Sequence, residues 1–215
     1  TNPTLELVDI AAVSEIAHRH GALVVVDNVF ANPMLQKPLQ HGADIVVYSA
    51  TKHIDGQGRV LGGAILGPKD YIDGGVQTLM RHTGPSMSPF NAWVLLKGLE
   101  TMRLRVDAQC VAAERIARFL EAHPRVNSVR YPFLESHPQH DLAKRQMSAG
   151  GTVVTFEVDG GKAGAFGFGF TWSPALSAVA PFSFALVGNP AAPHFTHPTD
   201  FPVQAWQLLE TQISS

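Results

Sequence analysis

The stretch LVVVDN (residues 23–28) decides the fold of this 215-residue chain. Its apolar residues are mostly β-branched and do not alternate with polar ones, which is typical of a strand covered on both faces in a parallel sheet. A second run of this kind, IVV (residues 45–47), is followed by Tyr-Ser, and Pro33 and Pro38 limit the connection between the two runs to short helical pieces. A strand, a connection and a second strand predict a right-handed parallel sheet in an α/β protein.

Helices are expected on either side of these runs. Asp9 is placed to cap a helix with regularly spaced apolar residues, and Gly21 is placed to end it. A third apolar stretch over residues 62–67 comes before a helix that Pro68 starts and that ends at about residue 82. The remaining pattern predicts a long helix over 89–122, strands over 126–131 and 152–158, and a short helix over about 137–147.

Two polar clusters follow the predicted strands, at the edge where such sheets bind ligands. Asp27 and Asn28 come after the first strand, and SATKH (residues 49–53) comes after the second. Taken singly, Asp27 is more often a turn or capping residue, and Lys52 is more often a surface lysine. Because the carboxyl ends of neighbouring parallel strands meet at one edge, the two clusters together predict a site.

The residue types of this site suit a carbonyl cofactor. A lysine amine forms a Schiff base with an aldehyde. Pyridoxal phosphate needs in addition a carboxylate facing its pyridine nitrogen, and hydroxyl or backbone N–H groups around its phosphate. Lys52 can supply the amine, Asp27 the carboxylate, and Ser49 and Thr51 the hydroxyls. The residues therefore predict a pyridoxal-phosphate site.

These segments also resemble a known family, the fold-type I pyridoxal-phosphate enzymes of cysteine and methionine metabolism. It includes cystathionine γ-synthases, γ-lyases and homoserine-ester sulfhydrylases. The interval of 25 residues from Asp27 to Lys52 matches its pattern, and residues 54–63 and 83–105 are most similar to the sulfhydrylases that act on O-succinylhomoserine. The resemblance covers about residues 1–160 and is carried by TNPTLELVDI (1–10), VVVDNVFANP (24–33) and YSATKHIDGQGRVLGGAILG (48–67).

The resemblance implies a fold for each part of the chain. Residues 1–88 would form part of an aminotransferase-like, layered α/β/α cofactor domain. Residues 89–122 would form a long connecting helix, and residues 123–160 the start of a small α+β C-terminal domain. Gln57 and Arg59, in the loop after the lysine, are expected to shape the mouth of the pocket and not to act in catalysis.

The resemblance also implies a role for each candidate site residue. Lys52 would hold the cofactor and, once released, move protons between the α- and β-carbons of the substrate. Asp27 would pair with the pyridinium nitrogen, and Ser49 and Thr51 would bind the phosphate. Asn2 resembles an asparagine that lies near the cofactor's phenolic oxygen and the substrate carboxylate. Its alternative is a capping role in an Asn-Pro turn.

The implied reaction is γ-replacement in methionine biosynthesis or transsulfuration: sulfide and O-succinylhomoserine, a small amino-acid substrate, give homocysteine and succinate. Cystathionine γ-synthase and γ-lyase are the alternatives, because they share Asp27, Ser49, Thr51 and Lys52. The family forms homotetramers with sites built across subunits, so the resemblance implies a homo-oligomer.

Departures from the family pattern favour another class, a catalytically inactive fragment. The chain opens in a turn at Thr1, without the glycine-rich phosphate loop and the stacking aromatic residue that the family carries. No arginine follows Arg145, although the family uses a C-terminal arginine to bind the substrate carboxylate. Residues 163–199 contain no Asp, Glu, Lys or Arg and show neither a helical nor a strand period. Residues 161–215 are therefore expected to form an atypical Phe/Pro-rich tail and not a natural continuation of the domain.

Composition excludes several other classes. With 16 Lys and Arg against 18 Asp and Glu, the net charge of −2 predicts no nucleic-acid partner. The sequence has no run of 18 apolar residues and no signal-peptide pattern, so no membrane span is expected. Cys110 is the only cysteine, which favours the cytoplasm, and a place in a helix core is expected for it. The proline-rich context of two histidine pairs argues against a metal site, although their spacing is that of ligands: His137 with His140, and His194 with His197.

Overall fold

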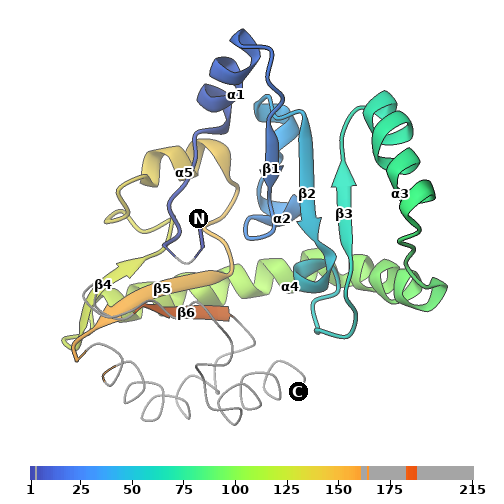
Figure 1. Cartoon of the computed structure of the whole chain (residues 1–215). Coiled ribbons are helices and arrows are strands. Elements are labelled where there is room, and N and C mark those ends of the chain that lie inside the picture. The colour runs from blue at the N-terminus through green and yellow to red at the C-terminus, as the bar shows by residue number, and fades with distance from the viewer. Residues whose placement is uncertain (3, 161–163, 165–182, 188–215) are drawn as a thin grey trace. The chain divides into compact units, whose positions relative to one another are not determined.

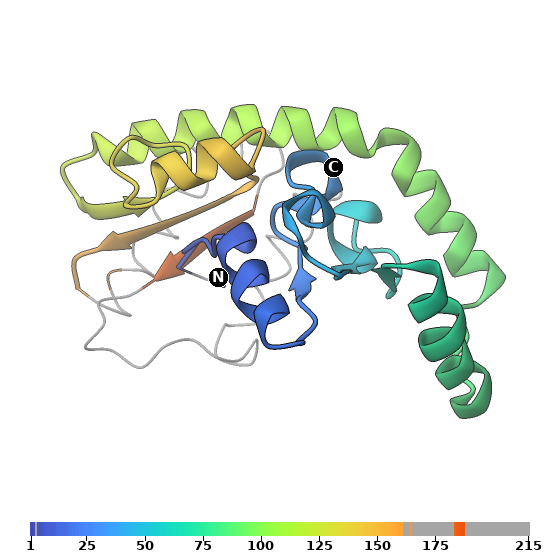
Figure 2. The ribbon, with the colours of Figure 1, turned by 90° about the horizontal axis from the view of Figure 1, so that it is seen from above.

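The computed structural model describes residues 1–2, 4–160, 164 and 183–187 (Figure 1). They form two compact units. The Lys52 unit contains residues 8–106 and 144–148, and the Tyr131 unit contains the described residues among 1–7, 107–143 and 149–187. Helix α4 (Pro89–Glu121) passes from one unit into the other as a continuous helix (Figure 2). It occupies the residues for which the apolar pattern predicts a long helix.

The first helix of the Lys52 unit confirms the predicted capping signals. Helix α1 (Ile10–Arg19) begins after Asp9, whose Oδ1 accepts a hydrogen bond of 3.0 Å from the backbone N–H of Ala12. This bond satisfies one of the free N–H groups of the first turn. The helix ends at His20, and Gly21 follows with a positive φ of 69°.

The sheet of the Lys52 unit has the strand order β1-β2-β3 (Figure 1). β1 (Val25–Asp27) and β2 (Ile45–Ser49) are parallel, as predicted, with Val25 opposite Ile45. β3 (Gly63–Leu66) runs antiparallel to β2, so the sheet is mixed, and the predicted parallel pairing holds for β1 and β2 but does not extend to the third apolar stretch. The segment between β2 and β3 folds as a compact turn and loop and lacks the crossover helix that usually joins parallel strands.

Burial in this sheet also differs from expectation. The apolar runs predict strands covered on both faces, and β2 fits this, since Ile45 and Val46 are buried. In the neighbouring strands, however, Val25 is 56% exposed and Ile65 is 47% exposed. The described residues therefore leave apolar side chains of both β1 and β3 in contact with solvent.

Short helical pieces connect these strands. Pro38 starts one of them, and Gly42 ends it with a φ of 95°. The helix predicted from Pro68 to about residue 82 is present over residues 69–83, and it contains a π-helical segment at Tyr71–Val76 before the α-helical Gln77–Thr83. The pieces are α2 (Asn32–Leu35), η1 (Pro38–His41), η2 (Ala50–Ile54), η3 (Tyr71–Val76) and α3 (Gln77–Thr83).

The Tyr131 unit packs a three-stranded sheet against the carboxyl-terminal part of α4 (Figure 2). The hydroxyl of Tyr131, which is fully buried, donates to the carbonyl of Gly151 at 3.0 Å. The buried cluster comprises Ala113, Ile116, Ala117, Leu120, Tyr131, Leu134, Val154, Phe156 and Val158. The sheet has the order β4 (Val126–Arg130), β5 (Val153–Val158) and β6 (Ser183–Val187), and α5 (His140–Gln146) lies between β4 and β5 in sequence.

β6 lies in the segment after residue 160, whose prolines argue against long helices and central strands. Ser183–Val187 pairs in parallel with β5 as the last strand in the order β4-β5-β6, so it is an edge strand and agrees with that expectation. The strand falls in a proline-free run between Pro181 and Pro190, so each of its residues can take part in the ladder. The predicted metal-free loop of His194 and His197 lies outside the described residues.

Within the described part of the chain, no helix has the length and apolar character needed to cross a membrane. In the same part, no three His, Cys, Asp or Glu side chains gather in a way that could hold a metal ion.

Candidate cofactor site

Asp27 is the last residue of β1, and the hydrogen bonds around it fix its place at the sheet edge. It lies opposite Val47 of β2, and the next residue, Asn28, donates its N–H to the Val47 carbonyl at 3.0 Å. The Asp27 Oδ1 accepts the N–H of Val29 at 3.0 Å. The side chain is exposed, and its other oxygen accepts no hydrogen bond from the described residues. One carboxylate oxygen is therefore available to a ligand.

Lys52 lies in η2, the turn that follows β2 directly. The carbonyl of Ala50 accepts the N–H of Asp55 at 2.9 Å, and that of Lys52 accepts the N–H of Gly56 at 2.7 Å. At Lys52 the backbone leaves helical geometry, with φ −86° and ψ −115°. Its side chain is exposed, and its amine has no hydrogen bond or ion pair with the described residues.

His53 connects the loop after Asp27 to the turn that holds Lys52. Its Nδ1 lies 3.1 Å from the Val29 carbonyl. Because a carbonyl oxygen only accepts, Nδ1 must carry the proton of this bond. Burial lowers the pKa of the His53 imidazole below its usual value, so the ring is neutral at neutral pH. The two predicted clusters are thus joined by a hydrogen bond, and Asp27 and Lys52 lie on neighbouring segments of one sheet edge.

The two predicted phosphate ligands differ in their hydrogen bonds. The Thr51 Oγ1 accepts the N–H of Gly62 at 3.1 Å and donates to the carbonyl of the same residue over a longer 3.4 Å. That carbonyl also accepts the N–H of Ala50 at 2.8 Å, so Thr51 serves in part to join the turn to the start of β3. Ser49 is half-buried, and its side chain does not cap the turn.

These residues fit pyridoxal phosphate chemically. An uncommitted amine at Lys52 can form a Schiff base, and the free carboxylate oxygen of Asp27 can accept a hydrogen bond from a protonated pyridine nitrogen. Ser49 and Thr51 can each offer a hydroxyl to a phosphate oxygen. The weak 3.4 Å bond of Thr51 leaves its proton free to turn toward such a ligand.

The other predicted residues lie elsewhere or have other partners. Asn2 belongs to the Tyr131 unit, so its role near the cofactor stays a prediction. Gln57 is exposed. Arg59 pairs with the buried Asp55, whose carboxylate accepts the Arg59 Nε at 2.8 Å and its backbone N–H at 2.5 Å. Arg59 thus holds the loop after Lys52 together, and its expected place at the mouth of a pocket stays a prediction.

A chain of buried amides supports the Asp27 loop, and the sequence analysis did not predict it. Asn28 donates to the Gln36 carbonyl at 3.0 Å and to the Tyr48 hydroxyl at 3.1 Å, and accepts from the Gln36 side chain at 2.8 Å. The Gln146 side chain in turn donates to the Gln36 Oε1 at 3.0 Å. Buried amides with satisfied partners fix local geometry, because each unmade bond would be costly. In the sequence, the one sign of this network is Asn28, a polar residue near the end of the apolar run that forms β1.

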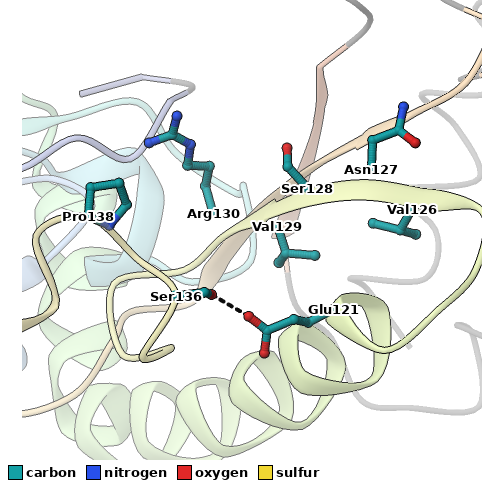
Figure 3. Close-up of a pocket in the computed structure, with 8 residues that line it drawn as sticks. All are labelled: Glu121, Val126, Asn127, Ser128, Val129, Arg130, Ser136 and Pro138. Atoms are coloured by element: carbon teal, nitrogen blue, oxygen red, sulfur yellow. Dashed lines mark hydrogen bonds between the residues drawn. The ribbon is translucent and has the colours of Figure 1, made fainter.

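A hollow of about 340 Å³ lies in the Tyr131 unit beside β4 (Figure 3). Residues 126–130 line it together with Glu121, Ser136 and Pro138, and the Ser136 hydroxyl donates to the Glu121 carboxylate. No predicted site residue lines it. Cys110, also in this unit, is buried as expected, and burial raises the pKa of its thiol to about 11.

Comparison with solved structures gives the class of protein first. The fold matches the apo form of CalE6, a methionine gamma lyase from Micromonospora echinospora, with a TM-score of 0.74 and 44% identity over 77% of this chain and 45% of that one. The solved structures that the fold matches are pyridoxal-phosphate enzymes of fold type I. The prediction that the chain has an α/β fold of this type is therefore confirmed.

The family follows from sequence. The chain belongs to the Cys/Met metabolism PLP-dependent enzyme family, whose model matches residues 1–171. It is 69% identical over 159 residues to the O-succinylhomoserine sulfhydrylase of Mycobacterium tuberculosis (strain H37Rv), which is 74% of this chain and 39% of that protein. It is 48% identical over 160 residues to cystathionine gamma-synthase 1, chloroplastic, of Arabidopsis thaliana, covering 74% of this chain and 28% of that protein. The chain thus spans two fifths or less of the length of these two curated relatives.

Proposed function

We propose that this chain carries the lysine-bearing part of a pyridoxal-phosphate site for γ-replacement. The substrates would be O-succinylhomoserine and sulfide, and the products homocysteine and succinate. One observation carries the proposal: the exposed amine of Lys52, which has no partner among the described residues, lies at the same sheet edge as the available carboxylate of Asp27. The similarity to O-succinylhomoserine sulfhydrylase supports the choice of substrate.

The proposed roles follow from the chemistry of each side chain. When bound, pyridoxal phosphate supplies an electron sink for carbanions at the substrate carbons. The Lys52 amine would take a proton from Cα and, after releasing it, one from Cβ, and protons would return to Cβ and Cα once sulfur has added at Cγ. Asp27 keeps the proton on the pyridine nitrogen, and Ser49 and Thr51 bind the phosphate oxygens. Succinate leaves with the electrons of the Cγ–O bond, and hydrosulfide provides the electrons of the new Cγ–S bond.

The alternatives within the family are cystathionine γ-synthase and γ-lyase. They would use the same lysine and carboxylate, and the similarity to the Arabidopsis synthase supports the first of them. A single cysteine in 215 residues supports a reducing compartment, for which we propose the cytoplasm. The family resemblance supports a homo-oligomer.

The visible spectrum of the chain with added pyridoxal phosphate tests this proposal. We expect an absorption band that borohydride removes, leaving a reduced adduct on the peptide that contains Lys52. Lys52→Ala should lack both the band and the adduct. Lys37→Ala removes another exposed lysine of the same unit and should keep both. A band of equal strength in the Lys52→Ala variant would overturn the proposal.

A second candidate function is cofactor binding without turnover. The exposure of both Asp27 and Lys52 favours it, because water-exposed groups act in a high-dielectric environment where electrostatic stabilisation is weak. The two candidates predict the same spectrum and differ in the release of succinate.

A further inference from the structure

The turn that holds Lys52 ends in two carbonyl groups that need hydrogen-bond donors. The Lys52 carbonyl accepts the N–H of Gly56 at 2.7 Å, and the carbonyls of His53 and Ile54 follow it in the chain. Gly56 then leaves helical geometry with a φ of 76°. Carbonyl groups at the end of a helical turn carry partial negative charge, so a cation is a favourable partner for them.

Arg105 of α4 supplies these donors. Its Nη1 donates to the His53 carbonyl at 3.0 Å, and its Nη2 donates to the Ile54 carbonyl at 3.3 Å. Its own helix holds the guanidinium in place, through Nη2 to the Gly98 carbonyl at 2.8 Å and Nε to the Thr101 hydroxyl at 3.1 Å. The planar group thus makes four hydrogen bonds, which a lysine ammonium could not reproduce at these positions.

Two glycines permit this contact between α4 and the turn. A Cβ on Gly98 would overlap the Ile54 carbonyl oxygen and would lie 3.1 Å from the Asp55 Cα. A Cβ on Gly56 would overlap the guanidinium of Arg105. Because both sites exclude even a methyl group, the distance between helix and turn is set by direct contact of backbone with backbone and with the guanidinium.

The charge of Arg105 is balanced within the same cluster. Burial lowers the pKa of the Arg105 guanidinium, and the buried Asp55 carboxylate acts in the opposite direction. An arginine remains charged even with a lowered pKa. Asp55 also accepts two hydrogen bonds from Arg59, so both ends of the loop after Lys52 are held by arginines.

We infer that Arg105 is a positioning residue that fixes the carboxyl end of the Lys52 turn, and with it the direction in which the Lys52 amine leaves the backbone. The effect on reactivity rests on the proposed function, because the Lys52 amine must approach the cofactor aldehyde along a defined path to react. Arg105 would contact neither cofactor nor substrate. It acts only through the backbone of His53 and Ile54.

The test compares Arg105→Lys with Arg103→Lys, which makes the same change at an exposed position of the same helix. Three quantities are measured on the full chain: borohydride trapping of pyridoxal phosphate on Lys52, acetylation of Lys52 by acetic anhydride, and amide hydrogen exchange of the peptide 50–56. Trapping depends on the direction of the amine. Acetylation by a small reagent depends on the exposure and the protonation of the amine, and not on its direction.

For Arg105→Lys we expect trapping at Lys52 to fall about tenfold, which corresponds to about 1.4 kcal/mol. Acetylation of Lys52 should stay unchanged, and exchange in the peptide 50–56 should accelerate. Arg103→Lys should match the unaltered chain in all three. If Arg105→Lys behaves like Arg103→Lys in trapping and exchange, the inference is wrong.

Two further comparisons separate a failure of this inference from a folding defect and from a failure of the proposed function. If Arg105→Lys does not fold, Thr101→Val removes the acceptor of the Arg105 Nε, together with the long 3.4 Å bond from the Thr101 hydroxyl to the Gly98 carbonyl. It leaves the other three bonds of the guanidinium in place and should shift trapping and exchange in the same direction by less; no shift in either overturns the inference. If pyridoxal phosphate does not label Lys52 in the unaltered chain, the proposed function fails. Exchange in the peptide 50–56 then decides the positioning role by itself.

Discussion

Asp44 connects the starts of β1 and β2 through its carboxylate. Its Oδ2 accepts the backbone N–H of Val24 at 2.7 Å and lies 2.9 Å from the His18 Nε2. The hydrogen bond from Val24 and then that from His18 lower the pKa of this carboxyl below its ordinary value of 3.8. The carboxylate thus contributes stability above the ordinary pKa, and this contribution is lost as the pH falls through the lowered one.

Asp44→Asn should therefore reduce the free energy of unfolding at pH 7 by about 1 kcal/mol. It should also weaken the acid dependence, because the variant has no carboxylate to protonate between roughly pH 5 and pH 2. Urea unfolding across this pH range measures both effects. Asp70→Asn, at an exposed position, is the control and should change neither. An Asp44→Asn variant with the acid dependence of the unaltered chain would contradict the assignment.

Among single residues, the sequence predicted those whose chemistry is visible in their neighbours along the chain. Asp27 and Lys52 each follow a β-branched run, so a sheet of the expected order brings them to one edge. Arg105 could not be found this way, because it acts on carbonyls about fifty residues earlier in the chain. Only the packing of α4 against the turn shows the contact.

Gly98 lies in the middle of α4, and its effect on stability in the structure is opposite to the one that helix propensity predicts. A glycine in the middle of a helix usually weakens it by about 1 kcal/mol relative to alanine. In the structure, a Cβ at this position would overlap the Ile54 carbonyl oxygen. The glycine therefore permits the contact between helix and turn.

Gly98→Ala should accordingly destabilise the chain by roughly 1–2 kcal/mol, because the overlap outweighs the gain in helix propensity. Gly75→Ala, in the helical segment η3, is the matched control. A Cβ there would have no neighbour within 4 Å, and we expect a stabilisation of about 0.5–1 kcal/mol. Urea unfolding of both variants decides the point. If Gly98→Ala stabilises the chain as Gly75→Ala does, the proposed close contact does not exist.

The other elements also differ in whether neighbouring or distant residues determine them. The Asp9 cap, the β1 and β2 runs and the length of α4 depend on neighbouring residues, and the sequence predicted them. The antiparallel direction of β3 depends on how tightly the chain after Lys52 turns back. The pairing of β6 with β5 joins residues about thirty apart in the chain. Neither relation leaves a period or a capping signal in the sequence.

At the scale of the whole molecule, the exposure of the site bears on activity. Asp27 and Lys52 are exposed in the described chain, and apolar residues of β1 and β3 are also in contact with solvent. Proton transfer at a substrate carbon is favoured where water is excluded and charges are held in a low-dielectric environment. The sequence also has no arginine after Arg145 to bind a substrate carboxylate from the C-terminal side.

We therefore expect the 215-residue chain to bind pyridoxal phosphate at Lys52 and to turn over slowly or not at all. The assay is sulfide-dependent release of succinate from O-succinylhomoserine, with Lys52→Ala as the blank. Release within the error of that blank, together with a normal adduct at Lys52, would favour the second candidate, cofactor binding without turnover. A turnover number of about 1 per second or more lies in the ordinary range for enzymes and would contradict this expectation. Such a rate would mean that the residues of this chain are sufficient both to exclude water from the site and to hold the substrate carboxylate.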